Sequence, residues 1–150
     1  PMLGVEMQMV SRAARDGKPI EGLETAAEQT AFLDGLSIET QREMLLQALE
    51  EGATISESID EIINAWRHGD IAALENGLLQ DLSENAELAE ALVNSRNRRW
   101  VDQISELLDD DDDYLIIVGA LHLVGEQGVP RLLARDGVEI DQLSEPPAVQ

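Results

Sequence analysis

Residues 114–140 read YLIIVGALHLVGEQGVPRLLARDGVEI. The first part, 114–118, is an unbroken apolar run that follows five aspartates, which is typical of a strand buried on both faces. Apolar residues at helical spacing come next and stop at Gly137, and a second short apolar run occupies 138–140. This order predicts a strand, a loop, a helix and a second strand, about the length that a parallel crossover needs.

His122 lies in the loop just after the first predicted strand. In open α/β sheets, ligand sites gather beyond the carboxyl ends of the strands, so His122 is a candidate site residue. The alternative is that His122 is a loop histidine with no chemical role, because position alone does not establish a site.

Glu24 is placed in the same way at the end of a second predicted strand, 19–23. Thr25 and Glu28 have the spacing of a capping box, so a helix should begin immediately after Glu24. Two residues able to bind a metal or move protons are therefore expected at the ends of two parallel strands. Glu24 could instead be a solvated carboxylate favoured by the positive end of the helix dipole.

Arg96 interrupts the apolar stripe of a helix predicted over 83–108, because it lies four residues from both Leu92 and Trp100. A buried arginine needs a carboxylate or another anion, so we expect Arg96 to orient Glu24 or a substrate carbonyl. The alternative is an arginine whose charged end reaches water at the edge of the stripe.

Residues 38–82 form a series of short amphipathic patterns without catalytic spacing. They could present an apolar groove to a partner. His68 precedes Gly69 at a predicted helix end, where an imidazole is favoured by the helix carbonyls, so a structural role is expected for it.

Several blocks of this sequence are similar to one known family. They are Gly119-x-x-His122 with Gly125 and Gly128, Gly17-Lys18 followed by Leu23-Glu24-Thr25 and Glu28-Gln29, and the pair Arg96-Asn97. In order and spacing, these blocks resemble the TraB/PrgY/GumN family, which includes the animal Tiki proteases.

The resemblance implies a metal-dependent hydrolase, with peptides as substrates in the Tiki branch. It implies a divalent metal, manganese, cobalt or zinc, bound by His122 and Glu24. It assigns catalytic roles to His122, Glu24 and Arg96, and places Gly119, Gly125 and Asn97 in the substrate loop.

One departure from the family pattern bears on these expectations. The family has an earlier Gly-x-x-His motif and an acidic strand, whereas this chain starts at Pro1 and its histidines are His68 and His122. We therefore expect residues 1–140 to be the C-terminal half of the family domain, with a missing N-terminal half as partner and the isolated chain inactive. Residues 141–150 are expected to be a disordered tail. The alternative function is a binding module with a vestigial Gly-x-x-His motif.

The expected fold class is α/β and helix-rich, with amphipathic helices around a small parallel sheet formed by 19–23, 114–118 and 138–140. It resembles half of an erythromycin esterase/ChaN-like fold. The length of 150 residues suits one domain or part of a larger one.

Charge and cysteine content exclude several functions. The chain has 31 acidic and 10 basic residues, a net charge of −21, which would repel nucleic acid. Without cysteines, thiolate metal sites and cysteine nucleophiles are excluded. A homo-oligomer is compatible with this composition. The resemblance favours an exported or periplasmic location, with the cytoplasm as the alternative.

Overall fold

A computed structural model describes residues 4–51 and 55–143, and these residues are helical apart from their connections. Within these ranges, seven α-helices have seven or more residues: α1 (Val5–Arg15), α2 (Ala26–Asp34), α3 (Ile38–Glu51), α4 (Ile55–His68), α5 (Ile71–Glu84), α7 (Ser95–Leu108) and α8 (Val129–Arg135). Three short pieces are α6 (Ala86–Ala89), the π-helical turn η1 (Glu90–Asn94) and the 3₁₀ turn η2 (Ala120–His122). No helix of the described ranges is both long and apolar enough to cross a membrane.

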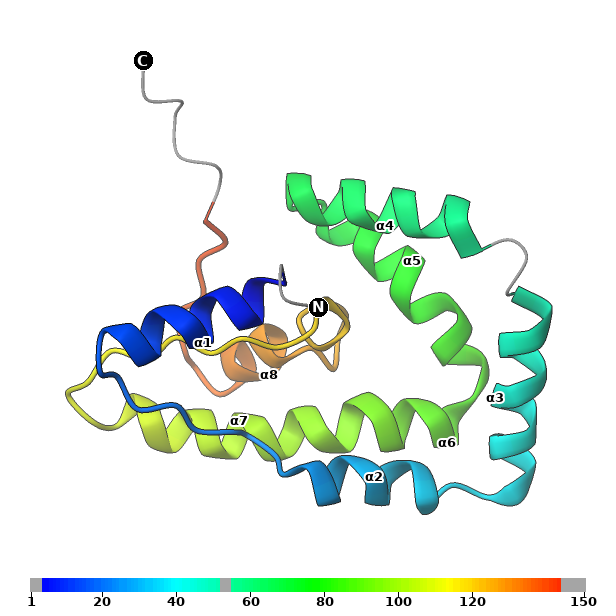
Figure 1. The fold of residues 1–150 in the computed structure, drawn as a ribbon, viewed down its shortest axis with the longest axis horizontal. Helices are drawn as coiled ribbons and strands as arrows, with labels where there is room; N and C mark the ends of the chain where they lie inside the picture. The colour runs from blue at the N-terminus through cyan, green and yellow to red at the C-terminus, as the bar shows by residue number, and fades with distance from the viewer. Residues whose placement is uncertain (1–3, 52–54, 144–150) are drawn as a thin grey trace.

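Figure 1 shows α6, η1 and α7 as one continuous rod. α2 lies along this rod beside η1, α8 packs on α7, and α4 and α5 form a hairpin whose second helix contacts α6 and η2. The rod therefore connects the two ends of the fold.

Helix starts follow the capping signals of the sequence. Thr25 and Glu28 form the expected capping box at the start of α2, with the Thr25 hydroxyl accepting from the Glu28 N–H and the Glu28 carboxylate accepting from the Thr25 N–H. Asp70 caps α5 by accepting from the Ala73 N–H. The long helix starts later than expected, at α6 rather than at Ser83, because α5 continues to Glu84 and Asn85 is the residue that caps α6.

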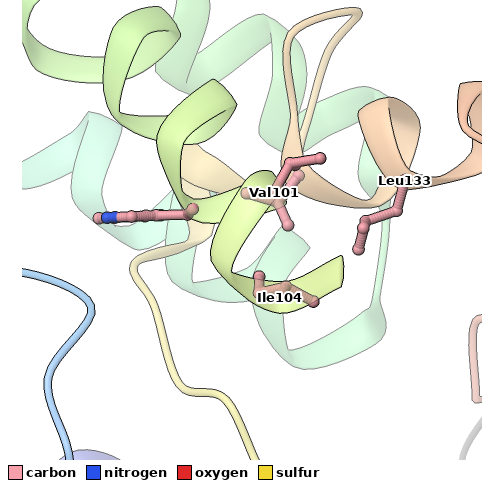
Figure 2. Packing of buried hydrophobic residues seen from close by; sticks show 5 residues of the cluster. Val101, Ile104 and Leu133 are labelled. Atoms are coloured by element: carbon pink, nitrogen blue, oxygen red, sulfur yellow. The ribbon is translucent and has the colours of Figure 1, made fainter. Parts of the chain in front are cut away.

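Two small apolar clusters hold the helices together. The first joins α7 to α8 and is formed by Trp100, Val101, Ile104, Val129 and Leu133, of which Figure 2 labels three. The second joins α4 and α5 to the loop after His122 and is formed by Ala65, Leu74 and Val124. The His122 loop is thus held between the two clusters.

The expected parallel sheet is wrong: the structure contains no strand within residues 4–51 and 55–143. Segments 19–23, 114–118 and 138–140 have no backbone hydrogen bonds to one another among those residues. Each still sends one half-buried side chain to the α7/α8 cluster, namely Leu23, Val118 and Val138.

The physical reason is that an apolar run is compatible with burial but does not establish it, and a strand also needs a neighbouring backbone with which to form hydrogen bonds. The run 114–118 is not buried on both faces, because Leu115 is 74% exposed and Tyr114 is 47% exposed. The α/β assignment, including its likeness to half of an erythromycin esterase/ChaN-like fold, therefore fails for this chain.

The expected tail, 141–150, falls mostly outside the described residues, which end at 143. Its first part returns to the helices, where the Gln142 side-chain amide donates to the carbonyl oxygen of Gly69 at 2.8 Å.

Candidate functional site

Asn97 and His122 form the centre of the candidate site. Asn97 lies on α7 and is fully buried, and His122 ends the η2 turn with 8% exposure. The Nδ1 atom of His122 lies 2.6 Å from Oδ1 of Asn97, and Nδ2 of Asn97 donates to the carbonyl oxygen of Gln127 at 2.7 Å. Asn97 thereby joins α7 to both ends of the loop between η2 and α8.

These two bonds determine the tautomer of His122. The Gln127 carbonyl only accepts hydrogen bonds, so the amide group of Asn97 faces it and Oδ1 faces the imidazole. Oδ1 also only accepts, so Nδ1 of His122 carries the proton and donates it. Nε2 then holds a lone pair in the neutral ring, and it makes no hydrogen bond to any residue that the structure describes. It is the atom available as a base or ligand.

His122 is held in this neutral form by its surroundings. Its pKa is lowered from 6.5 to about 4, chiefly by burial and also by the positive charge of Arg96, while the negative charge of Glu24 opposes both effects. A histidine with this pKa carries no proton on Nε2 at neutral pH, so this nitrogen can accept a hydrogen bond or bind a cation.

Glu24 and Arg96 form a buried ion pair, as the apolar stripe around Arg96 predicted. The Glu24 side chain is 1% exposed and that of Arg96 is 16% exposed. Nε of Arg96 donates to both carboxylate oxygens, at 3.0 and 3.1 Å, and Nη2 donates to Oε2 at 2.8 Å. Nη1 of Arg96 donates to the carbonyl oxygen of Leu92 at 2.9 Å. The arginine is thus anchored at every nitrogen.

Arg99, one helical turn after Arg96, was missed by sequence reasoning. Its Nη2 donates to Oε1 of Glu24 at 2.6 Å, and its Nη1 lies 3.8 Å from a Glu28 oxygen. The phenyl ring of Phe32, on α2, stacks against both guanidinium groups, at 5.2 Å for Arg99 and 5.4 Å for Arg96. The sequence signal was the spacing of three residues, which places both arginines on one side of the helix.

The structure places the predicted substrate-loop glycines at two locations. A Cβ built on Gly119 would lie 3.9 Å from Cδ2 of His122, so this residue lies beside the imidazole. Gly125 lies on the other side of the loop, against α5. Its φ of +77° and a built Cβ only 2.6 Å from Cδ1 of Leu79 show that glycine is required there for the loop backbone.

Glu24 and His122, the two predicted metal ligands, differ in the lone pairs that they leave available. Glu24 accepts four hydrogen bonds from two guanidinium groups, which occupies the lone pairs that a metal would need. No group of three or more histidine, aspartate or glutamate side chains is suitably placed within residues 4–51 and 55–143. His122 Nε2 is the available ligand atom of the predicted pair, and one ligand does not hold a divalent metal tightly.

The structure therefore brings the predicted residues together as two linked pairs. Glu24 pairs with Arg96, His122 pairs with Asn97, and the neighbouring positions of Arg96 and Asn97 on α7 join the pairs. Glu24 affects His122 through its negative charge, which raises the pKa of the imidazole, rather than through a hydrogen bond. The arrangement offers a neutral imidazole beside a fixed positive charge.

Comparisons with known proteins point to the same family that the sequence motifs resemble. The chain is 27% identical over 130 residues to the uncharacterized protein YbaP of Escherichia coli K12, an alignment that covers 87% of this chain and 47% of YbaP. The YbaP of Shigella flexneri gives the same identity and coverage. The chain thus spans about half the length of the curated relatives it matches. No solved structure gives a significant match. The model of the TraB/PrgY/gumN family matches residues 1–142, and the chain belongs to this family.

Proposed function

We propose that this chain contributes the proton-accepting histidine of a hydrolase site for peptide substrates. The observation that carries the proposal is the hydrogen bond from Nδ1 of His122 to Asn97, which leaves the lone pair on Nε2. A water molecule beside Nε2 could give up its proton as its oxygen attacks a substrate carbonyl, and the same imidazole could then protonate the leaving amine.

Arg96 and Glu24 support this role without contacting the substrate. Because every nitrogen of Arg96 is anchored, its charge stays in a fixed position near His122. This charge adds to the effect of burial in lowering the pKa of His122 and so helps to keep the imidazole neutral.

We propose that the site is completed by polypeptide beyond this chain. The relatives extend well past the matched 130 residues, and the described residues contain no group of three or more histidine, aspartate or glutamate side chains placed to hold a metal. Manganese, cobalt or zinc, which the family resemblance implies, would need further ligands from that polypeptide beside His122. Export to the periplasm stays a prediction from the family resemblance.

The test compares hydrolysis of a defined peptide mixture by this chain and by a polypeptide that carries the whole family domain, each with and without added manganese, cobalt or zinc. We expect no cleavage by the chain alone. We expect cleavage by the longer polypeptide that falls at least about 100-fold in His122→Gln, because general-base catalysis is typically worth that much. His68→Gln is the matched control, since His68 is exposed and bonds to the Asn64 carbonyl within its own helix. Cleavage that is unchanged in His122→Gln would refute the proposal.

A second candidate function, a protein interaction module, is favoured by the surface of α3 and α4. Large apolar side chains are exposed on each helix: Ile38 (80%), Leu45 (63%) and Leu49 (72%) on α3, and Trp66 (55%) on α4, where it lies beside Val5 and Ile116. Exposed large apolar side chains can serve as contacts for a protein partner. Under this reading the longer polypeptide has no hydrolase activity, and His122→Gln leaves partner binding intact.

A further inference from the structure

Trp100 contacts both the imidazole and the arginine of the candidate site. Its ring centroid lies 4.5 Å from that of His122, with 50° between the ring planes. The guanidinium carbon of Arg96 lies 4.9 Å from the indole centroid. Trp100 is 4% exposed, so both contacts are shielded from water.

We propose that Trp100 is a positioning residue, which holds the imidazole of His122 and the guanidinium of Arg96 at a fixed separation through its indole ring. The inference rests on the proposed function, because it gives Trp100 a part in keeping Nε2 ready to accept a proton. It does not depend on which substrate is hydrolysed.

Core packing alone does not explain a tryptophan at this position. Trp100 belongs to the apolar cluster between α7 and α8, where leucine or phenylalanine would also bury apolar surface. Its indole N–H is buried and has no hydrogen-bond partner among the described residues, which is unfavourable. The indole ring offsets this cost by giving a guanidinium a better face than any other side chain does.

The imidazole needs a second contact besides Asn97. The bond from Nδ1 to Asn97 fixes one atom of the ring, and a ring held at one atom can still tilt. The indole contacts the imidazole ring itself and so restricts this tilt. The direction of the Nε2 lone pair then depends on Asn97 and Trp100 together.

Arg96 is held between two aromatic side chains. The Phe32 ring lies 5.4 Å from its guanidinium carbon, and the Trp100 ring lies 4.9 Å from it. Phe32 also stacks on Arg99, whereas the indole contacts His122. Losing the indole should therefore affect the imidazole, and losing the phenyl ring should affect it much less.

The experiment is an NMR titration of the two imidazoles, His68 and His122, in the whole 150-residue chain. His68→Gln leaves His122 as the single histidine of the 150-residue sequence and so assigns the two signals. The variants are Trp100→Leu and Trp100→Phe, with Phe32→Leu as the matched control, and circular dichroism checks that each is folded.

We expect the pKa of His122 to rise by about one pH unit or more in Trp100→Leu, because both the shielding of the ring and the nearby cation are weakened. Trp100→Phe should give a smaller rise of about half a pH unit, since a phenyl ring is a weaker partner for the cation. Phe32→Leu should leave the pKa of His122 near its wild-type value.

If Trp100→Leu does not fold, the more conservative Trp100→Phe decides the question, and a rise in the pKa of His122 supports the proposal. A pKa of His122 that stays at its wild-type value in every folded Trp100 variant would overturn it, because the indole would then have no influence on the imidazole that it contacts. The readout is independent of hydrolysis, so a failure here is distinguishable from a failure of the proposed function.

Discussion

Asn97 fixes which nitrogen of His122 carries the proton, because its Oδ1 accepts from Nδ1 at 2.6 Å while its Nδ2 donates to the Gln127 carbonyl oxygen at 2.7 Å. The two residues lie 25 positions apart in the chain, and the contact is buried. It ties the most interior polar side chain of α7 to the Gly-x-x-His motif.

Asn97→Ala should destabilise the fold and release the imidazole. The Gln127 carbonyl and Nδ1 of His122 would both lose their partner in a buried setting, which costs about 1–3 kcal/mol for each group left unpaired. Urea unfolding followed by circular dichroism measures the change. Gln103→Ala, at a half-buried position of the same helix, is the control and should cost less than about 1 kcal/mol. Equal losses in the two variants would contradict the role given to Asn97.

Replacing Arg96 or Arg99 by methionine tests how much each ion pair with the buried carboxylate of Glu24 stabilises the fold. Arg96→Met removes the less exposed partner of Glu24 and should cost about 3 kcal/mol, the usual loss when one member of a buried pair is removed. Arg99→Met removes a partner whose side chain is 37% exposed, so a cost of about 1 kcal/mol is expected. Both free energies of unfolding come from urea titrations at pH 7. A larger loss for Arg99→Met would show that Glu24 depends mainly on the outer arginine.

The stability of the chain should depend on His122 between pH 6.5 and pH 4. The pKa of this residue is lowered from 6.5 to about 4 in the folded chain, so the unfolded chain takes up a proton first as the pH falls. The contribution of His122 is therefore complete above pH 6.5 and is lost as the pH falls through 4. The measurement is the urea midpoint of wild type and His122→Gln across this range.

The difference between the two proteins isolates His122 from the carboxylates. Glu28 and Glu87 also have lowered pKa values, Glu28 chiefly through the Thr25 backbone N–H and Glu87 chiefly through the Thr40 hydroxyl, and both titrate in either protein. The wild-type midpoint should fall more steeply than that of His122→Gln. Parallel curves would mean that His122 has the same pKa in the folded and unfolded chains.

Gly125→Ala should destabilise the loop that carries His122. The residue has φ of +77°, and its added Cβ would approach Leu79 to 2.6 Å, so strain and a steric clash add to about 2 kcal/mol or more. Gly137→Ala is the matched control, since it also has positive φ but no atom lies within 4 Å of the added Cβ. It should cost about 1 kcal/mol by thermal or urea unfolding. Equal costs would show that Leu79 moves aside freely.

The sequence predicted features that depend on local chemistry. The capping box at Thr25 and the ion pair of Arg96 with Glu24 are confirmed, because side-chain spacing defines the first and the requirement of a buried charge for a partner defines the second. The capping box and the need of Arg96 for an anionic partner can be inferred without knowing the path of the chain, whereas the choice of Glu24, 72 positions away, depends on that path.

Features that depend on the path of the chain could not be predicted in the same way. The sheet prediction is wrong because an apolar run such as 114–118 neither establishes burial, since Leu115 is 74% exposed, nor supplies a neighbouring strand. The bond between Asn97 and His122 and the contacts of Trp100 join residues from separate segments, and no local pattern reports them. The metal prediction for His122 and Glu24 stays a prediction.

The π-helical turn η1 explains how one rod can serve two different packing surfaces. Its extra residue appears as the bond from the Ser95 N–H to the Glu90 carbonyl oxygen, five positions back. Each residue turns an α-helix by about 100°, so deleting one residue within 90–94 would rotate Arg96 and Asn97 by that angle relative to α6. Such a deletion would keep every residue of the site, but the side chains of Arg96 and Asn97 would point away from Glu24 and His122. Members of this family should therefore differ far more in the residue types of segment 90–94 than in its length.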